Sequence, residues 1–524
     1  MSKTLEKREV VIVGAGAAGS TYAALLAEAG RDVLVLERGT ARKLGDLYSS
    51  QTWARRLKWG APTVVQDGAD SIWYNFNAGH GYGGAALHHY GVWPRFHPED
   101  MELQSRYGRG LDWPFGYDEL RPYYDQVQKY VGIAGDAEQE IWRPPGEPYP
   151  LPPVLINNHG HTLAKGFHKL GMHTAPVPVA VLSQPYNGRP ACIWDGWCDA
   201  GCPTGALANP LVTYKPRAEQ AGAGFQAHTA VTRLLTDDSG KRVTAVEYYD
   251  QAGEHYIQPA DVVVLCAFTV ENSRLLLNSA NRQHRNGLAN SSDAVGRYIM
   301  SHPAAGIFGM FREQMDNYLG ITGGQIMVQS AYDKTGDPDG AFGSRQWLAG
   351  LALKPNDLLG IAMTRPDLYG AALEDFMQRA VRHMGAMVGV IEDQAEPDNR
   401  VRLADAKDPY GMPIARVTYR ASEDGRRLWQ TALQEGMAVM RAAGAEETWH
   451  GPRGAQHIMG GTIMGRDSGQ SVTNGHGQTH DVKNLFIGGP SLFPCSSCVN
   501  STFTVHALAT KSAAYLIGHW TDIV

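Results

Sequence analysis

The chain has 524 residues, of which 43% are hydrophobic and 19% are charged, as in ordinary soluble globular proteins with two or three domains. Its net charge of −6 at pH 7 provides no basic surface, so a nucleic-acid partner is not expected. No apolar run approaches the ~18 residues of a membrane-spanning helix, and the charged N-terminus does not resemble a signal peptide. Composition alone therefore indicates a cytoplasmic protein.

In chain order, residues 10–13 are predicted to form a buried strand, the stretch up to Ala29 a helix, and residues 32–37 a second parallel strand. The segment 80–130 is rich in Gly, His, Trp and Tyr and predicts loops with short helices. The Pro-rich residues 143–153 predict an extended surface crossover. Later elements are expected as strands at 243–249, 261–265 and 484–488 and as helices at 371–384, 422–443 and from about 500 onward.

The turn after the first strand carries the glycine pattern of a dinucleotide-binding loop. Gly14 permits the turn, Gly16 lets the backbone approach a pyrophosphate, and Gly19 allows close packing of helix on strand. Glu37 ends the second strand, where an acid can bind the two hydroxyls of an adenosine ribose. The pattern predicts a bound dinucleotide and does not by itself separate FAD from NAD.

Three of the six cysteines, Cys192, Cys198 and Cys202, fall within eleven residues, and a proline follows the last one. Six cysteines are too few for a disulfide framework in a chain of this length. Closely spaced loop thiols can hold an iron–sulfur cluster, whereas zinc would want a fourth ligand, for which Asp195 and Asp199 are the candidates nearby. The same spacing is compatible with a local disulfide or with thiols that bind nothing.

Several motifs near the C-terminus occur together with Gly83 and Gly84 in an order that is specific to one family. The segments are Gln456–Gly465, Asn484–Pro494 and Val499–Ala509, and upstream of them stand Pro185–Pro190 and Asn290–Arg297. From about residue 8 to 518 the chain resembles the glucose–methanol–choline (GMC) flavoprotein oxidoreductases. Within them it is most similar to the large subunits of bacterial three-component dehydrogenases for sugars and polyols, such as those for fructose, glucose, sorbitol and gluconate.

The resemblance implies an α/β fold, α+β overall, with a Rossmann-like FAD-binding domain built from discontinuous segments and a substrate domain with an antiparallel sheet. The FAD-binding domain is expected at 1–110, 190–302 and 446–524, with an iron–sulfur loop at 188–206. The substrate-binding domain is expected at 111–189 and 303–445.

The same resemblance implies the catalytic pair His457 and Asn500. Alcohol oxidation removes the hydroxyl proton and transfers a hydride from the same carbon to flavin N5. An imidazole with a pKa near neutrality can take that proton while an amide orients the oxygen. Asn500 is alternatively a plain helix N-cap. Expected cofactor contacts, besides the glycines and the acid above, are Gly83, Gly84, His88, Val231 and Gly488.

His88 matches a position that in some relatives bonds covalently to the flavin, and a pocket-lining or packed histidine is the alternative. Aromatic and histidine side chains that could contact a sugar are Trp73, Tyr74, His88, His89, Tyr90 and Trp93. For Cys495 and Cys498 two interpretations remain, a disulfide close to the flavin or small residues packed beneath the site.

By the resemblance, Cys192, Cys198 and Cys202 hold a three-iron four-sulfur (3Fe-4S) cluster. It passes single electrons from FAD to an external acceptor, such as a multi-haem cytochrome c subunit. A small subunit with an export signal is the second implied partner. Co-export with it would place the chain on the periplasmic side of the inner membrane, which it would meet only through partners. Two competing functions are an oxidase that reduces O2, with cysteines that bind no cluster, and a non-catalytic flavin-holding subunit.

Overall fold

The computed structural model describes residues 2–524 and contains three sheets. The largest sheet has a path of six strands, β6-β3-β2-β9-β8-β7, with β1 and β18 paired to β9. Its parallel part, β6-β3-β2-β9-β18, is assembled from three distant parts of the chain. The strands are β1 (Lys3–Thr4), β2 (Arg8–Val13), β3 (Val33–Leu36), β6 (Gly224–Gln226), β7 (Ala230–Thr236), β8 (Val243–Tyr249), β9 (His255–Leu265) and β18 (Leu485–Ile487).

The second sheet has the order β16-β10-β13-β12-β11-β5, with β17 also paired to β10, and all of its pairings are antiparallel. Its strands are β5 (Ala175–Pro176), β10 (Met300–Met310), β11 (Ile326–Ala331), β12 (Arg345–Ala349), β13 (Met384–Ile391), β16 (Glu447–His450) and β17 (Gly454–Met459). A small third sheet joins β4 (Val65–Asp67), β14 (Arg400–Lys407) and β15 (Pro413–Thr418).

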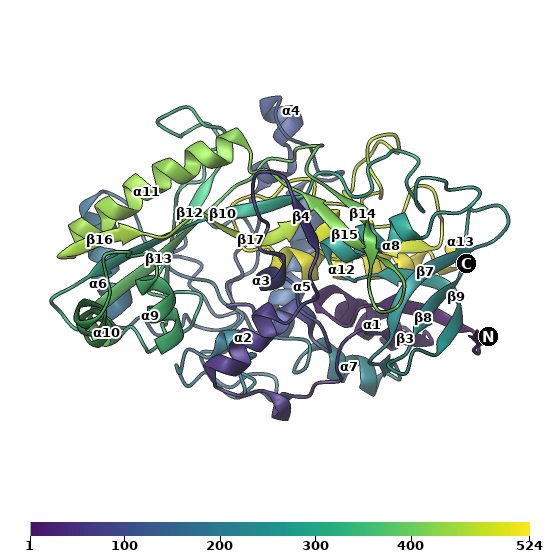
Figure 1. Ribbon diagram of the computed structural model, residues 1–524, viewed down its shortest axis with the longest axis horizontal. Helices are drawn as coiled ribbons and strands as arrows, with labels where there is room; N and C mark the ends of the chain where they lie inside the picture. The colour runs from purple at the N-terminus through teal and green to yellow at the C-terminus, as the bar shows by residue number, and fades with distance from the viewer. Residues whose placement is uncertain (1) are drawn as a thin grey trace.

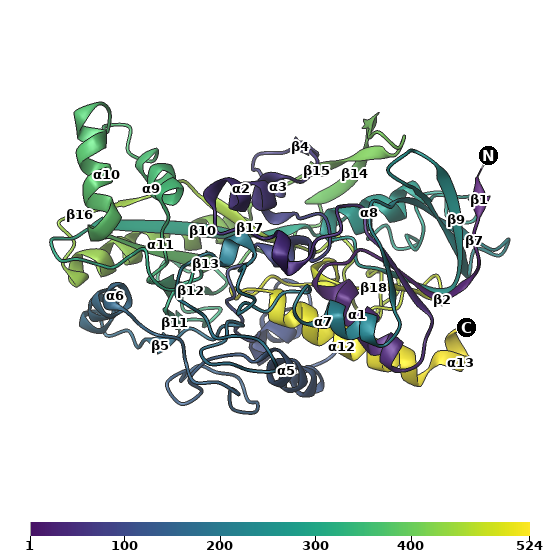
Figure 2. The same ribbon diagram turned by 90° about the horizontal axis from the view of Figure 1, so that it is seen from below.

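The helices cover both large sheets, and the two ends of the elongated molecule carry different ones (Figures 1 and 2). Both termini lie at the end formed by β7, β8 and β9, whereas α9, α10 and α11 lie at the opposite end. The helices are α1 (Ala17–Glu28), α2 (Gln51–Trp59), α3 (Tyr74–Asn77), α4 (Leu103–Tyr107), α5 (Tyr117–Val131), α6 (Asn158–Lys169), α7 (Tyr214–Gln220), α8 (Thr269–Asn278), α9 (Pro355–Ala362), α10 (Ala371–His383), α11 (Glu423–Ala443), α12 (Thr502–Gly518) and α13 (Trp520–Ile523).

The strand–turn–helix–strand at the N-terminus forms as the hydrophobic pattern predicts. Residues 10–12 of β2 are completely buried because the parallel sheet is covered on both faces. Helix α1 is likewise almost entirely buried and packs on α7 and on α12. The α/β fold class with an antiparallel second sheet is thereby confirmed.

Helix α5 is longer than expected for the segment 80–130. Its buried residues recur at helical spacing, at Tyr117, Leu120, Tyr124, Val127 and Val131, and this apolar face packs against α12. The packing keeps Pro122 inside the helix, although proline is unfavourable there. Within residues 2–524, no helix has both the length and the apolar character needed to cross a bilayer.

Candidate active site

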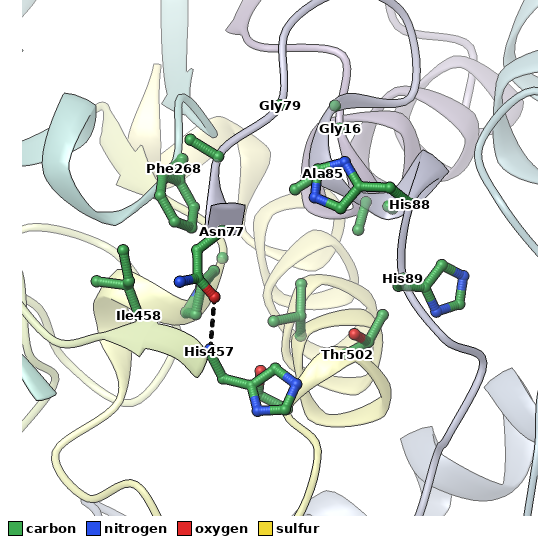
Figure 3. A pocket seen from close by; sticks show the side chains of 18 of the residues that line it. Gly16, Asn77, Gly79, Ala85, His88, His89, Phe268, His457, Ile458 and Thr502 are labelled. Atoms are coloured by element: carbon green, nitrogen blue, oxygen red, sulfur yellow. Dashed lines mark hydrogen bonds between the residues drawn. The ribbon is translucent and has the colours of Figure 1, made fainter. Parts of the chain in front are cut away.

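A cavity of about 460 Å³ lies between the two large sheets. One side is formed by the carboxyl ends of β2 and β9, the place where open parallel sheets bind their ligands. The other side is formed by β10, β12, β13 and β17 of the second sheet. Figure 3 shows the cavity from close by, with side chains from both sides directed toward it.

The glycine loop forms one end of the cavity. Gly14 has a φ of +104°, and a Cβ there would stand 2.4 Å from the carbonyl oxygen of Cys266. A Cβ on Gly19 would stand 1.9 Å from the carbonyl oxygen of Gly14, so Gly19 serves helix packing and does not line the cavity. Gly16 differs, because a Cβ there would have no protein atom closer than 4.0 Å. The open space beside Gly16, at the start of α1, fits the pyrophosphate expected there.

Glu37 also lines the cavity, and its carboxylate is held by the backbone. It accepts N–H bonds from Ala15 at 2.9 Å, Gly39 at 2.8 Å and Gly81 at 2.9 Å. Arg38 lies beside it on the cavity wall. The geometry leaves Glu37 rigid at the position predicted to bind a ribose.

The remaining predicted cofactor contacts divide into two groups. Gly84, Val231 and Gly488 line the cavity. Gly83 does not, and a Cβ on it would stand 2.5 Å from the side chain of Leu87, so its place in the motif reflects local packing.

His88 lines the cavity next to Gly16 and Ala85 (Figure 3). Its side chain is buried, and its Nδ1 has no hydrogen-bond partner among residues 2–524. Burial, reinforced by the Lys58 charge, lowers the pKa of His88 to about 3, so the ring is neutral. An unpaired buried nitrogen is costly unless a ligand meets it. His88 therefore fits contact with a bound cofactor.

The neighbouring His89 is fully engaged by the protein. Its Nε2 donates to the carbonyl oxygen of Ala208 at 2.8 Å, and its Nδ1 accepts from the backbone N–H of Gly91 at 3.2 Å. Of the other aromatic side chains considered for a sugar site, Tyr74 and Tyr90 line the cavity and Trp73 and Trp93 do not. Trp93 is 1% exposed and stacks on Phe503, so it is a core residue.

His457 projects from β17 into the cavity, opposite His88 (Figure 3). Its backbone has a φ of +55°, a strained conformation that residues other than glycine rarely adopt. The backbone N–H of His457 donates to Oδ1 of Asn77 at 2.8 Å, which holds this conformation. Asn77 lies 380 residues away in the sequence.

A second histidine fixes which ring nitrogen of His457 carries the proton. Nε2 of His302 lies 3.1 Å from the carbonyl oxygen of Ser496, so it donates, and Nδ1 of neutral His302 is an acceptor. Nδ1 of His457 lies 2.9 Å from that acceptor and must donate to it. The lone pair of the neutral His457 ring is therefore on Nε2.

The pKa values agree with this assignment of neutral rings. Burial, with a smaller contribution from His302, lowers the pKa of His457 to about 3. Burial also lowers the pKa of His302 to about 4. The expectation of a base with a near-neutral pKa is thus not met in this structure, because desolvation disfavours the charged form of both rings. Nε2 of His457 is unprotonated throughout the neutral range.

Asn500 completes the pair, with Nδ2 at 3.3 Å from Nε2 of His457. Its Oδ1 accepts from Nε2 of Gln346 at 3.1 Å. The N-cap of α12 is Ser501, so Asn500 is not the helix cap. The chain of hydrogen bonds continues from Gln346 to Gln329 at 3.1 Å and on to His97 at 3.2 Å, and it fixes the orientation of the Asn500 amide.

The three clustered cysteines lie outside this cavity, in a loop packed on a separate apolar cluster. Sγ of Cys192 accepts from the backbone N–H of Trp194 at 3.4 Å, and Sγ of Cys202 accepts from that of Leu207 at 3.3 Å. Burial raises the pKa of Cys192 to about 12 and also raises that of Cys198. No group of three or more His, Cys, Asp or Glu side chains within residues 2–524 is arranged to hold a metal ion.

The two candidate zinc-ligand acids and the remaining cysteines are engaged by the protein. Oδ1 of Asp195 accepts from the backbone N–H of Trp197 at 3.3 Å, and Asp199 forms a buried ion pair with Lys58. All six cysteines are free thiols, so Cys495 and Cys498 form no disulfide in this structure. Both are completely buried, and Sγ of Cys495 accepts from the indole N–H of Trp113 at 3.1 Å, consistent with small packed residues.

The fold and the cavity together define a dinucleotide-binding protein with a histidine–asparagine pair facing the ligand space. Family models for GMC oxidoreductases match residues 8–304 and 395–509. The chain is 32% identical to the fructose dehydrogenase large subunit of Gluconobacter japonicus, with 98% of each chain covered. It is 30% identical to 2-methyl-1,2-propanediol dehydrogenase of Mycolicibacterium austroafricanum, covering 100% of this chain and 98% of that one.

A solved FAD-dependent oxidoreductase from Chaetomium thermophilum superposes with a TM-score of 0.69 at 13% identity, covering 98% of this chain and 100% of the other. Likeness at this level of identity supports the fold alone. The family models cover most of the chain, and this protein belongs to the GMC oxidoreductase family. The predicted family is thereby confirmed.

Proposed function

We propose that the protein is an FAD-dependent dehydrogenase that oxidises a hydroxyl group of a sugar, a polyol or a related alcohol. The observation that carries the proposal is the His457–Asn500 pair, with the lone pair of Nε2 and the amide Nδ2 3.3 Å apart at the cavity. Family membership supports FAD as the cofactor. The open space at Gly16 and the unpaired Nδ1 of His88 fit a ligand that extends along the cavity.

The geometry indicates how this chain would promote the reaction. A substrate oxygen that replaces this direct contact from the cavity side can accept from the Asn500 amide while its own proton moves to Nε2 of His457. The resulting imidazolium keeps its Nδ1–H bond to His302, whose lone pair stabilises the new charge. FAD, when bound, supplies the acceptor for the hydride that leaves the same carbon.

Contact between His88 and the flavin also belongs to this proposal, and a covalent bond between them is its stronger form. The free Nδ1 of His88 supports the contact. Unfolding the protein in acid tests the bond: colour that stays with the chain supports it, and colour that separates excludes it.

We further propose that Cys192, Cys198 and Cys202 bind a three-iron four-sulfur cluster and pass electrons to an external acceptor such as a cytochrome c. Two N–H···S bonds and the position of all three thiols in one loop support a cluster. Because the three sulfurs are not arranged as a metal site among residues 2–524, binding requires them to move together. The thiols of Cys192 and Cys198 carry raised pKa values, so binding must displace protons from them. The similarity to a dehydrogenase large subunit supports a further subunit as a partner. A cytochrome c partner, a small subunit with an export signal, and location on the periplasmic side of the inner membrane by co-export complete the proposal.

The second candidate function is an oxidase that transfers the electrons to O2. Analysis of one purified sample distinguishes the dehydrogenase from the oxidase. If the protein is the dehydrogenase, we expect iron, acid-labile sulfide and fast dye reduction with slow peroxide formation. A pure flavin spectrum with rapid peroxide production would favour the oxidase. A flavin that no alcohol or sugar reduces would exclude both.

A further inference from the structure

The wall that the second sheet presents to the cavity is almost entirely apolar. Its strands contribute eight residues, and the two with polar side chains, Gln456 and His457, are both on β17. The others are Gly306 and Phe308 of β10, Leu348 of β12, Met387 and Val388 of β13, and Ile458 of β17.

This wall follows from strand register. Gly306 lies opposite Val388, and Val388 lies opposite Leu348, so the three form one row across neighbouring strands. Phe308 faces the same side as Gly306, because side chains two residues apart share a face of a strand. Leu351, just after β12, extends the wall and packs with Phe308 in the apolar cluster that reaches α9 and α10.

The polar side chains beside the wall are mostly engaged by the protein itself. Gln346 faces the same side of β12 as Leu348, and its amide is committed to Asn500 and Gln329. The side chain of Gln456 makes no hydrogen bond to the protein within residues 2–524, so it is free to meet a ligand. Polar recognition from this sheet is therefore concentrated at the end that holds His457.

We infer that the substrate is an alcohol with one polar end and an apolar remainder, a short-chain or aryl-type primary or secondary alcohol or terminal diol. The inference rests on the proposed function and narrows it. Each further hydroxyl directed at the wall would be desolvated without a partner, which weakens transition-state binding by about tenfold. Each further methylene packed on the wall would strengthen it by about fourfold.

Six-carbon substrates provide the test: hexan-1-ol, hexane-1,2-diol, sorbitol and glucose, assayed by dye reduction with the flavin-loaded protein. We expect kcat/KM for hexan-1-ol or the diol to exceed that for sorbitol and glucose by about 100-fold. Equal or better turnover of sorbitol or glucose would overturn the inference while leaving the proposed function standing. Failure of every alcohol and sugar to reduce a fully loaded flavin would instead reject the proposed function.

Two variants locate the effect on the wall. Val388→Thr places a hydroxyl there at almost constant volume, and Phe308→Tyr does so on a half-buried ring. In each, the preference for hexan-1-ol over sorbitol should fall about tenfold. The matched control is Val328→Thr, a buried position of β11 that packs in a different apolar cluster and does not line the cavity. The inference is contradicted if the preference for hexan-1-ol over sorbitol is unchanged in both Val388→Thr and Phe308→Tyr. It is also contradicted if this preference falls equally in the control variant Val328→Thr.

Discussion

The His457 region and the cysteine loop are both buried, yet they differ in how fully the protein commits their reactive atoms. Around His457, every nitrogen of the two rings and both polar atoms of the amide have a partner, and the Nε2 lone pair of His457 accepts from the Asn500 amide at the cavity. In the cysteine loop, two of three sulfurs accept one backbone N–H each, and burial raises the pKa of Cys192 and Cys198. The His457 region is therefore organised before any ligand binds. In the cysteine loop, a bound cluster would have to displace the protons of the thiols.

The largest expected effect tests the preorganised region. His457→Ala removes the proton acceptor, so kcat should fall by about 10²–10⁴ while FAD content is retained. His450→Ala, an exposed histidine on β16, is the matched control and should keep normal turnover. Rapid dye reduction by a flavin-loaded His457→Ala protein would rule out this base.

The cysteine loop is tested by Cys198→Ser. We expect the loss of bound iron and sulfide and about a 100-fold slower transfer to a cytochrome acceptor, with flavin reduction by substrate unchanged. Cys498→Ala, a fully buried cysteine outside the loop, should keep its iron. Iron analysis and stopped-flow spectroscopy provide the two measurements. Absence of iron from the unaltered protein would reject the cluster.

The next effect concerns His302, a positioning residue. His302→Leu takes away the acceptor for Nδ1 of His457 and frees that ring to change tautomer, so kcat should fall by about 10–100-fold. His302→Asn keeps an acceptor near the same place and should restore part of the loss. A purely structural role predicts instead that both variants lose activity in proportion to their melting temperatures.

A smaller effect is expected at Gln346. Gln346→Leu removes the donor that holds Oδ1 of Asn500, and misorientation of the amide should lower kcat by about tenfold. Gln346→Glu keeps the shape and only accepts, so it should not rescue the activity. Equal activity of the unaltered protein and Gln346→Leu would show that Asn500 is oriented without this contact.

The smallest effect is on stability and arises from the buried neutral histidines. The unfolded chain takes up protons below about pH 6.5, whereas the folded rings do so only near pH 3–4, so stability falls as the pH drops below 6.5. The slope is up to about 1.4 kcal/mol per pH unit for each ring. Calorimetry in buffers of different ionisation enthalpy should detect proton uptake on unfolding near pH 5, and its absence would mean the rings are charged in the fold. The rings are His88, His89, His97, His159, His302, His457 and His506.

The sequence was sufficient to predict the fold class and the family, because both depend on local patterns. The strand–turn–helix at the N-terminus follows from glycine spacing and a continuous apolar run. The motifs around His457 and Asn500 predicted that these residues act together, and they lie 3.3 Å apart.

The sequence could not predict the residues that hold this pair. His302 and Gln346 lie 155 and 154 residues from their partners, and no local pattern marks such contacts. Trp93 was predicted as a candidate pocket residue but lies in the core. Cores and pockets use the same aromatic side chains, so the sequence cannot separate the two. The apolar wall depends on the register of three strands, which the sequence does not reveal.

Anaerobic stopped-flow reduction of the bound flavin tests the role of His457 most directly, since it isolates the step at this residue from any later electron transfer. Mixed with hexan-1-ol, the unaltered protein should lose its oxidised flavin absorbance within seconds, and His457→Ala should do so at least about 100-fold more slowly. Equal rates for the two proteins would contradict the assignment of His457 as the proton acceptor.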